Sequence, residues 1–354
     1  MTARWDRDMA SLVLTELDRR RSTFDGLPFD PQHVEWIRHR TWVRTLNATT
    51  RIEGNSLNDI QVEELLNGTT VRVSRREALE VLGVRSALEF VDDIVARRDV
   101  PLGEDVVREI HRRVLEDIDP MLTPGRYRQG PNRVVDPDGN TIFTTPPSGD
   151  VPDLMRSFGL WLRDASTLPA PVAASLAHLE FVAIHPFYDG NGRTSRAIAR
   201  LLLGRGGYDF DGLVSLDAYL DLDRQHYFRA IAETTGGSYQ PDYDASTFVE
   251  YFLGAAIAAT DHALNRLRGL TKVTMAVRRD VTDGVLPAAM LDGLAYAWIN
   301  RSLRPADYIE ITRRTKQSAT RDFRIATRLG YLVPTGETKA RRYLAGSRLD
   351  EYAL

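Results

Sequence analysis

Hydrophobic residues recur at intervals of three and four along most of the chain, which is the spacing of one face of an α-helix. The clearest stretch runs from Arg75 to Ala96, with apolar side chains along one side from Ala78 to Ile94. Similar patterns predict other helices in the first 45 residues, with a new helix at Pro31, and within 61–73, 102–115, 154–162, 176–184, 193–204, 216–228, 248–258, 286–303, 306–312 and 316–329. We therefore expect a predominantly helical protein.

Two places depart from this pattern. Residues 133–135 and 141–144 are β-prone and flank a turn-rich segment at 136–140, which predicts a β-hairpin. Residues 331–344 contain a glycine turn between extended pieces and follow three predicted helices, an order that resembles a winged helix. The expected fold class is all-α with one small hairpin, plus a C-terminal winged-helix domain.

The apolar pattern weakens around 268–286, so a domain boundary is expected there. We therefore predict an N-terminal helical region at 1–100, a core at 101–270 and a C-terminal domain at 271–354.

Composition narrows the function classes. The chain has 354 residues, with 46 basic and 49 acidic side chains, so overall charge favours neither a nucleic acid nor a membrane as partner. The absence of cysteine excludes disulfides, thiol catalysis and cysteine metal sites. Residues 1–20 lack the apolar core of a signal peptide, and no run approaches the roughly 20 apolar residues that span a bilayer. We expect a cytoplasmic protein without a membrane partner.

The C-terminal segment is a local exception to this neutral charge. Arg321, Arg324 and Arg328 share one helix face, as they would on a helix that follows DNA phosphates. Other basic residues lie nearby: Arg313, Arg314, Lys316, Lys339, Arg341 and Arg342. DNA binding and a protein interaction through a basic surface both explain this cluster.

The residues best suited to chemistry are concentrated in one stretch, His185-Pro186-Phe187-Tyr188-Asp189-Gly190-Asn191-Gly192-Arg193-Thr194-Ser195-Arg196. The apolar spacing upstream places His185 at a helix end, and Pro186 stops that helix because proline has no N–H group. The Asp-Gly-Asn-Gly segment forms a turn in which glycine can take positive φ, and a second helix follows it.

A glycine-bearing turn that opens a helix binds anions, because free N–H groups and the helix dipole point outward there. Arg193 and Arg196 face the same side and suit phosphate oxygens. Asp189 offers a hard oxygen ligand for Mg²⁺, and His185 can take a proton from a hydroxyl near neutral pH. Each feature alone is usually a core histidine, a plain turn or a solvated pair of arginines. Together within twelve residues they predict phosphoryl or nucleotidyl transfer.

The stretch resembles the Fic-family motif, His-Pro-Phe-x-Asp-Gly-Asn-Gly-Arg-x-x-Arg, and matches every specified position. The resemblance implies an α-helical fold and transfer of AMP from ATP to a Ser, Thr or Tyr hydroxyl of a protein. It implies that His185 is the general base, that Asp189 is the Mg²⁺ ligand, and that Phe187 is a packing anchor. The implied nucleotide-binding residues are Gly190, Asn191, Gly192 and Arg193 at the α- and β-phosphates, and Arg196 at the γ-phosphate.

A glutamate lies near the end of an upstream helix, in the segment Thr49–Gly54. Acids are favoured at the other end of a helix, so Glu53 is either an ordinary surface residue or a functional one. The segment resembles the inhibitory pattern of many Fic proteins, Ser/Thr-x-x-x-Glu-Gly/Asn, N-terminal to the catalytic motif. The resemblance implies that Glu53, with Thr49 and Gly54 in its motif, pairs with Arg196 and takes the place of the γ-phosphate.

The same resemblance implies two further roles. In Fic proteins a hairpin at this position is the flap beside the active site, where the target's backbone docks by strand addition. The candidates for target positioning are therefore Val134, Val135, Ile142 and Phe143; a surface hairpin without function is the alternative. Tyr227 is expected beside the adenine, although core packing explains a helical aromatic equally well. His111 falls within a predicted helix and is interpreted as structural or incidental.

The sequence thus predicts a protein adenylyltransferase that uses ATP and Mg²⁺, is autoinhibited by Glu53 and modifies itself as well as a target protein. Two alternatives stay open. The same fold could transfer another nucleotide such as UMP or remove AMP, or the protein could be a DNA-binding regulator with a sensory Fic core. The family resemblance also implies self-association, as a homodimer of unspecified geometry.

Overall fold

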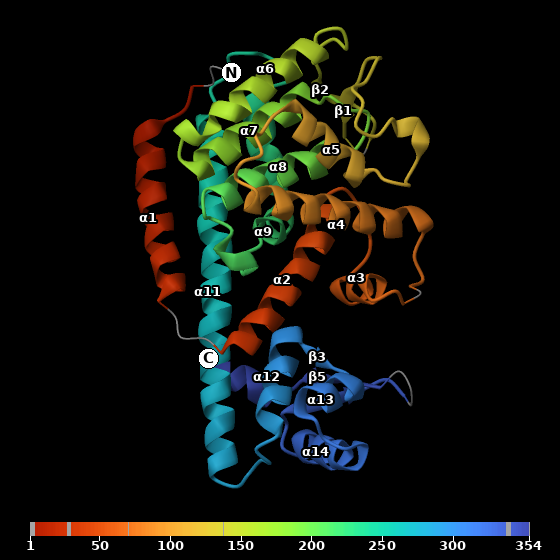
Figure 1. Ribbon diagram of the computed structural model, residues 1–354, viewed down its shortest axis with the longest axis vertical. Helices are drawn as coiled ribbons and strands as arrows, with labels where there is room; N and C mark the ends of the chain where they lie inside the picture. The colour runs from red at the N-terminus through yellow and green to blue at the C-terminus, as the bar shows by residue number, and fades with distance from the viewer. Residues whose placement is uncertain (1–3, 27–29, 70, 137, 338–340, 354) are drawn as a thin grey trace. The chain divides into compact units, whose positions relative to one another are not determined.

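The computed structural model describes residues 4–26, 30–69, 71–136, 138–337 and 341–353 (Figure 1). Contacts within the chain divide it into two compact units: Met1–Asp25 with Trp42–Thr260, and Gly26–Thr41 with Asp261–Leu354. We call these the first and the second unit. The division falls inside two helices, α2 (Pro31–Arg51) and α11 (Ser246–Thr282). None of the helices in the described residues is long and apolar enough to cross a membrane.

The first unit is built from helices and one hairpin. Its other helices are α1 (Arg7–Asp25), α3 (Asp59–Leu66), α4 (Arg75–Ala96), α5 (Glu104–Val114), α6 (Val151–Asp164), α7 (Ala170–Ile184), α8 (Asn191–Arg205), α9 (Leu216–Leu222) and α10 (Arg224–Thr235). Short 3₁₀ turns lie at Pro120–Leu122, Ala165–Thr167 and Phe210–Gly212.

The core of this unit is the helix pair α7 and α8. Almost every residue of α7 is buried, as its nearly continuous apolar sequence requires, because a helix that is apolar all round belongs in the interior. α7 packs against α8 and α6, while α5 packs against α4, α6 and α8. In Figure 1 the pair lies between α6 and α4. The loop that joins α7 to α8 therefore starts and ends on well-packed helices.

The hairpin consists of β1 (Arg133–Val135) and β2 (Thr141–Thr144), paired antiparallel with an irregular register between Val134 and Val135. Phe143 is buried and anchors β2 in the core, whereas Val135 and Ile142 are exposed. The far side of β2 is held by main-chain bonds: Thr144 N donates to Gly237 O, and Tyr239 N donates to Thr144 O. The turn around Pro137 includes a position outside the described residues.

The largest difference from the sequence-based expectation is α11. The apolar pattern was expected to end near residue 258 and to weaken over 268–286, but the helix runs unbroken to Thr282. Between residue 258 and Thr282 the buried leucine and valine side chains of α11 keep a helical spacing of three to four: Leu264, Leu267, Leu270, Val273 and Val277. The many charged residues between them mask this stripe in the sequence. The contacts within the chain group its residues differently from the predicted division into 1–100, 101–270 and 271–354. That division stays a prediction.

The second unit has its own apolar core and a three-stranded antiparallel sheet with strand order β3-β5-β4. Its elements are α12 (Met290–Asn300), β3 (Ser302–Leu303), α13 (Pro305–Thr312), α14 (Lys316–Arg328), β4 (Leu332–Thr335), β5 (Arg342–Ala345) and α15 (Ser347–Ala353). Lys339, in the predicted basic cluster, lies outside the described residues. The winged-helix assignment stays a prediction.

Candidate active site

The loop between α7 and α8 begins at His185, which caps α7 in a left-handed conformation with φ of 50°. Its Nδ1 lies 3.2 Å from the carbonyl oxygen of Val182. Because a carbonyl only accepts, this contact places the proton on Nδ1 and leaves the Nε2 lone pair free. Burial lowers the pKa of His185, so the ring is neutral at pH 7. A neutral imidazole with a free Nε2 can act as a general base.

Arg128 fixes the position of His185. Its buried guanidinium donates from Nε to His185 O at 2.9 Å and from Nη2 to Pro146 O at 2.6 Å, with a third bond from Nη1 to Gly130 O. Its main-chain N–H donates to Pro186 O. One side chain therefore connects the catalytic loop to the base of the hairpin. Nothing in the sequence analysis pointed to this role for Arg128.

Two buried and stacked rings, of Phe187 and His111, support the loop between α7 and α8. Phe187 is fully buried and stacks on His111, with ring centroids 3.4 Å apart and an interplanar angle of 3°. His111 Nδ1 accepts from Gly125 N at 2.9 Å, so Nε2 carries the proton and donates to Asp189 O at 2.9 Å. Burial lowers the pKa of His111 to about 4, which keeps it neutral. His111 is thus a structural support of the loop.

The loop continues into the first turn of α8, where the amide groups lack intrahelical acceptors. Gly190 has a φ of 76° and forms the N-cap of α8, a conformation that favours glycine. The side-chain amide of Asn191 is bonded to the main chain of Phe187 at both atoms, at 3.0 Å from Phe187 N and 2.9 Å to Phe187 O. Asn191 therefore shapes the loop with its side chain, and what it offers an anion is its main-chain N–H.

Arg193 and Arg196 are both 4% exposed. Among the described residues, Nε and Nη1 of Arg193 and Nη1 of Arg196 have no hydrogen-bond acceptor, and Arg193 Nη1 forms an ion pair with Glu80 Oε1 at 4.0 Å. Buried donors of a charged group are costly to leave unpaired. These atoms lie on the first turns of the helix that follows the glycine loop, where an anion can accept their hydrogen bonds.

The remaining donors of Arg196 are used by the end of α2. Nε donates to Thr49 Oγ1 at 2.8 Å, and Nη2 donates to Thr49 O at 2.8 Å and to Glu53 Oε1 at 2.9 Å. Asp217 adds an ion pair at 3.5 Å from Nε. Burial opposes the charge on Arg196, but the carboxylates of Glu53 and Asp217 raise its pKa above the ordinary value. The predicted inhibitory segment and the predicted phosphate-binding arginine are therefore in direct contact.

The carboxylate of Glu53 also lies directly over the glycine loop. A Cβ atom at position 192 would be 2.2 Å from Glu53 Oε1, so the carboxylate in this position lies directly against the glycine main chain. Gly54 has a φ of 99° and turns the chain after α2. Asn55, which is buried, then donates to the carbonyl of Glu77 and to Glu80 Oε2, both at 3.0 Å. The end of α2 is thus held in place on both sides of Glu53.

Asp189, the predicted metal ligand, is bonded to two arginines. Oδ1 accepts from Arg193 Nη2 at 3.0 Å and from Gly190 N at 2.6 Å, and Oδ2 accepts from Arg76 Nη2 at 2.9 Å. The described residues contain no group of three or more acidic, histidine or cysteine side chains able to enclose a metal. Mg²⁺ is commonly held by one or two carboxylates with phosphate oxygens supplying the rest. A single carboxylate beside free anion donors fits that mode of binding.

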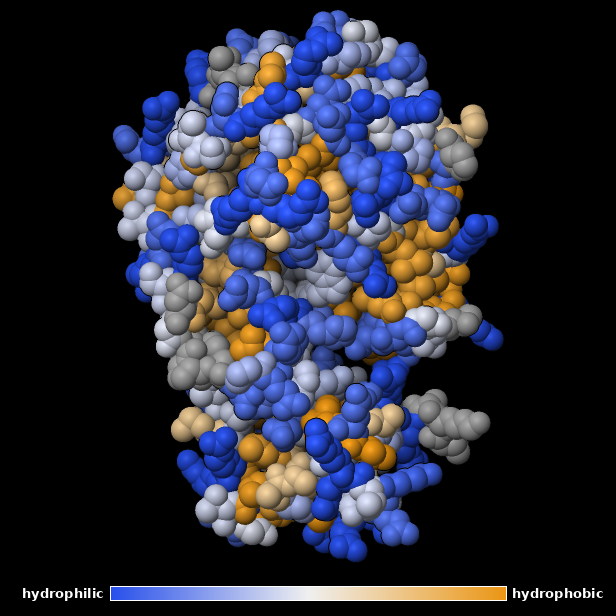
Figure 2. Space-filling view, in the orientation of Figure 1, coloured by the Kyte–Doolittle hydropathy of each residue, from blue (hydrophilic) through white to orange (hydrophobic). Residues whose placement is uncertain are grey.

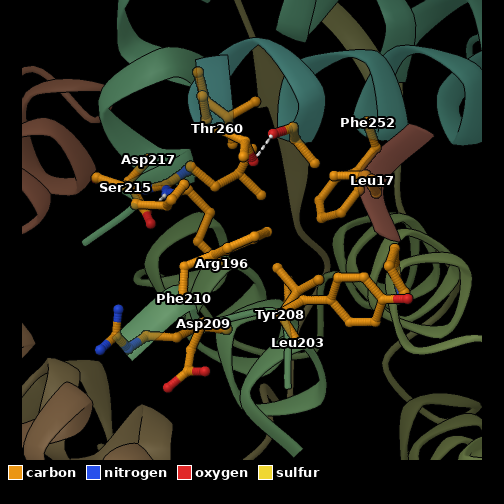
Figure 3. A pocket seen from close by; sticks show the side chains of 18 of the residues that line it. Leu17, Arg196, Leu203, Tyr208, Asp209, Phe210, Ser215, Asp217, Phe252 and Thr260 are labelled. Carbon is orange, nitrogen blue, oxygen red and sulfur yellow. Dashed lines mark hydrogen bonds and ion pairs between the residues drawn. The ribbon is translucent and has the colours of Figure 1, made fainter. Parts of the chain in front are cut away.

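Tyr227 lies in the core rather than in an open pocket. The residue is 1% exposed and its hydroxyl lies 2.8 Å from His178 Nε2. A pocket of about 50 Å³ nearby is lined by Arg196, Asp217, Leu17 and other residues, but not by Tyr227 (Figure 3). The packing interpretation of Tyr227 is therefore favoured over contact with adenine.

The predicted flap residues differ in what they can offer a target. Val135 and Ile142 are 44% and 53% exposed, and Val134 is half-buried. Phe143 faces the core, so its side chain anchors the hairpin and does not contact a target. Asn132 connects the hairpin to the catalytic loop through a bond from Nδ2 to Phe187 O at 3.0 Å. The exposed hairpin is therefore fixed relative to His185.

Parts of the chain are similar to known proteins. The model of the Fic/DOC family matches residues 101–203. Protein adenylyltransferase Fic of Drosophila melanogaster is 32% identical over 201 residues, which are 55% of this chain and 39% of that protein. The chain therefore spans about two fifths of the length of such curated relatives.

Solved structures of Fic proteins share the fold. A Fic family protein from Desulfovibrio desulfuricans G20 has a TM-score of 0.62 at 21% identity, covering 98% of both chains. Fic-1 (residues 134–508) from C. elegans has a TM-score of 0.61 at 25% identity, covering 73% of both chains. The helical fold with its small hairpin is therefore confirmed. The motif, the α7–α8 pair and these matches together show that the chain contains a Fic/DOC-family domain.

Proposed function

We propose that this chain is a protein adenylyltransferase that transfers AMP from ATP to a hydroxyl group of a protein. The observation that carries the proposal is the set of buried guanidinium donors of Arg193 and Arg196, on the first turns of α8, that lack a hydrogen-bond acceptor. They provide binding capacity for a polyphosphate directly beside a neutral base. The relatives named protein adenylyltransferase Fic agree with this chemistry.

In the proposed reaction the target hydroxyl oxygen attacks the α-phosphorus of ATP, and its proton moves to Nε2 of His185. The bond from the α-phosphorus to the oxygen that bridges to the β-phosphorus breaks, and pyrophosphate leaves. The amide groups of the first turn of α8 and the Arg193 guanidinium stabilise the charge that develops on the phosphate oxygens. Arg128 holds His185 in place during the transfer through its bond to the His185 carbonyl.

Mg²⁺ would be held by Asp189 together with the phosphates, where it would offset their negative charge. The Asp189 main chain is fixed by His111, so the carboxylate is presented from a rigid position. Its bond to Arg76 neutralises the carboxylate in the free chain and is the bond that a metal would replace.

We also propose that Glu53 inhibits the reaction. Its carboxylate contacts Nη2 of Arg196 and lies against Gly192, so it fills space and removes a cation that the γ-phosphate needs. ATP can then bind only with its phosphates displaced, and the α-phosphorus is misaligned for attack. Glu53 is about one third exposed whereas Arg196 is buried, so the carboxylate is the partner that is free to move away.

The target is proposed to bind along the hairpin, beside the exposed residues Val135 and Ile142. Strand addition uses main-chain hydrogen bonds and depends little on the target's amino-acid sequence. It would therefore suit an enzyme that modifies several hydroxyl-bearing segments, including segments of its own chain. The hydrogen bonds of Arg128 and Asn132 fix the position of the hairpin relative to His185.

The test is incubation with Mg²⁺ and a panel of ATP, GTP, CTP and UTP, followed by intact mass. We expect an AMP adduct on Glu53→Gly with ATP, a weaker adduct on the wild-type chain, and none on Glu53→Gly/His185→Ala. If another nucleotide forms an adduct that depends on His185, the transferred group in the proposal would be that nucleotide's monophosphate instead of AMP. Absence of any nucleotide adduct on Glu53→Gly, with and without added protein substrates, would contradict the proposal.

A further inference from the structure

The second unit has a helix face that the proposed transfer reaction does not use. Residues that point outward from α14 recur at intervals of three and four, which places them on one side of the helix. These exposed residues are Gln317, Thr320, Arg321, Arg324, Thr327 and Arg328. We call them the α14 face. Figure 2 shows mainly hydrophilic residues over the part of the surface that α14 occupies in Figure 1.

The opposite side of α14 is packed, so the α14 face is held in a fixed orientation. Phe323 stacks on Tyr343 of β5, with centroids 4.0 Å apart and an interplanar angle of 3°. Asp322 is fully buried and accepts from Tyr308 at 2.8 Å and from two nitrogens of Arg314 at 3.0 and 3.1 Å. The sole acidic side chain of α14 is therefore neutralised inside the unit.

The α14 face carries positive charge without internal compensation. Residues 313–328 include six basic side chains and one acid, Asp322. Apart from Arg314, which pairs with Asp322, these basic residues are exposed: Arg313, Lys316, Arg321, Arg324 and Arg328. None of these five forms an ion pair with another described residue. Long exposed cations held apart from acids are available to an external polyanion.

The elements around α14 are arranged like those of a helix-turn-helix, a motif that places its second helix against DNA. α13 and α14 are joined by three residues, 313–315, with Arg313 in a left-handed conformation of φ 52°. This is the turn length of a helix-turn-helix, in which the second helix lies in the major groove. The 13 residues of α14 extend about 20 Å, and the groove is about 12 Å wide. β4 and β5 follow as a hairpin beside α14.

We propose that the α14 face binds double-stranded DNA, with α14 in the major groove. Arg321, Arg324 and Arg328 contact phosphates or guanine edges, and Gln317 and Thr320, near the N-terminus of α14, can reach base edges. A membrane surface is disfavoured because the apolar side of α14 is packed in the core and the α14 face has no large apolar residue. An acidic protein is the remaining competitor, and the experiment separates it.

The test measures binding of the full-length chain to a short fluorescent DNA duplex by anisotropy over a series of salt concentrations. The variant is Arg321→Glu/Arg324→Glu. The matched control is Arg72→Glu/Arg229→Glu, which makes the same change in net charge at exposed positions of the first unit. We expect at least about tenfold weaker binding for the α14 variant and a salt slope smaller by about 2, because two phosphate contacts are lost. The control should stay within about twofold of wild type.

Further measurements keep the proposal falsifiable. Circular dichroism and the urea unfolding curve show whether the α14 variant folds, and Arg324→Ala/Arg328→Ala, which only removes charge, replaces it if it does not. Equal losses in the variant and the control, no binding at low salt, or tighter binding to an acidic polypeptide than to the duplex would each overturn the proposal. The result is independent of nucleotide transfer, because the readout uses neither ATP nor the first unit's catalytic loop.

Discussion

Arg128 is a buried cation whose side-chain bonds all go to main-chain carbonyl groups, and its replacement by methionine tests how the catalytic loop is held. Methionine matches the aliphatic part of the arginine side chain but has no guanidinium group and therefore no donor. Arg128→Met would leave the carbonyls of His185, Gly130 and Pro146 without this partner. Each buried acceptor left unpaired costs about 1–3 kcal/mol. Removing a buried charge that lacks a carboxylate partner recovers part of this loss, so we expect about 3 kcal/mol lower stability.

The same change should also slow transfer. His185 would lose the bond that fixes its carbonyl, and a displacement of about 1 Å at a catalytic group can lower the rate about 100-fold. The assay compares urea unfolding curves and the single-turnover rate in a Glu53→Gly background. Arg126→Met is the matched control, because Arg126 is exposed in the segment that also contains Arg128. An Arg128→Met protein with the stability and rate of the control would refute the role assigned to Arg128.

Three more outcomes follow from the site. The acid limb of the rate profile of Glu53→Gly should lie below pH 6.5, because burial lowers the pKa of the His185 base; a limb at or above 6.5 would contradict this. The free energy of unfolding should fall from pH 6.5 toward pH 4, by about 3 kcal/mol from His111 alone, because that imidazole takes up a proton first in the unfolded chain. Urea titrations at several pH values measure this, and a flat or rising curve would exclude it. Asn191→Ala should lower stability by about 1–3 kcal/mol through the lost bonds to Phe187, and an unchanged unfolding midpoint would count against this bracing.

The local geometry of the motif from His185 to Arg196 was predictable, because its residues are adjacent in sequence and their conformation follows from residue type. His185 ends α7, the glycines open α8, and Arg193 and Arg196 lie on the first turns of that helix. Fold class was predictable for the same reason, since helical periodicity is a local property.

The side-chain contacts that hold the motif in place could not be predicted, because they join segments that are distant in the sequence. Arg128 reaches His185 across 57 positions, and Arg76 reaches Asp189 across 113. Neither arginine stands in a pattern that distinguishes it from a surface residue. His111 was interpreted as structural or incidental from its helix alone, and its stacking on Phe187 and its bond to Asp189 were not foreseeable.

Burial also changed how individual site residues are interpreted. Phe143 and Tyr227 have the residue types expected for a target contact and a base contact, yet both side chains lie in the core. Alternation within a four-residue strand shows that neighbouring residues face opposite sides but not which side is buried. For α11 the error was in the other direction, because charged residues hid an apolar stripe that continues to Val277.

In the proposed mechanism, Glu53 holds Arg196 and thereby restrains a site that is otherwise competent for transfer. The most direct measurement is the initial rate of AMP incorporation at saturating ATP and Mg²⁺ for the wild-type chain, Glu53→Gln and Glu53→Gly. Glutamine keeps the shape of the side chain but removes the charge that pairs with Arg196. We predict a rate for Glu53→Gly at least about tenfold above wild type, with Glu53→Gln between them. Equal rates for the three proteins, with incorporation detectable in each, would contradict the account.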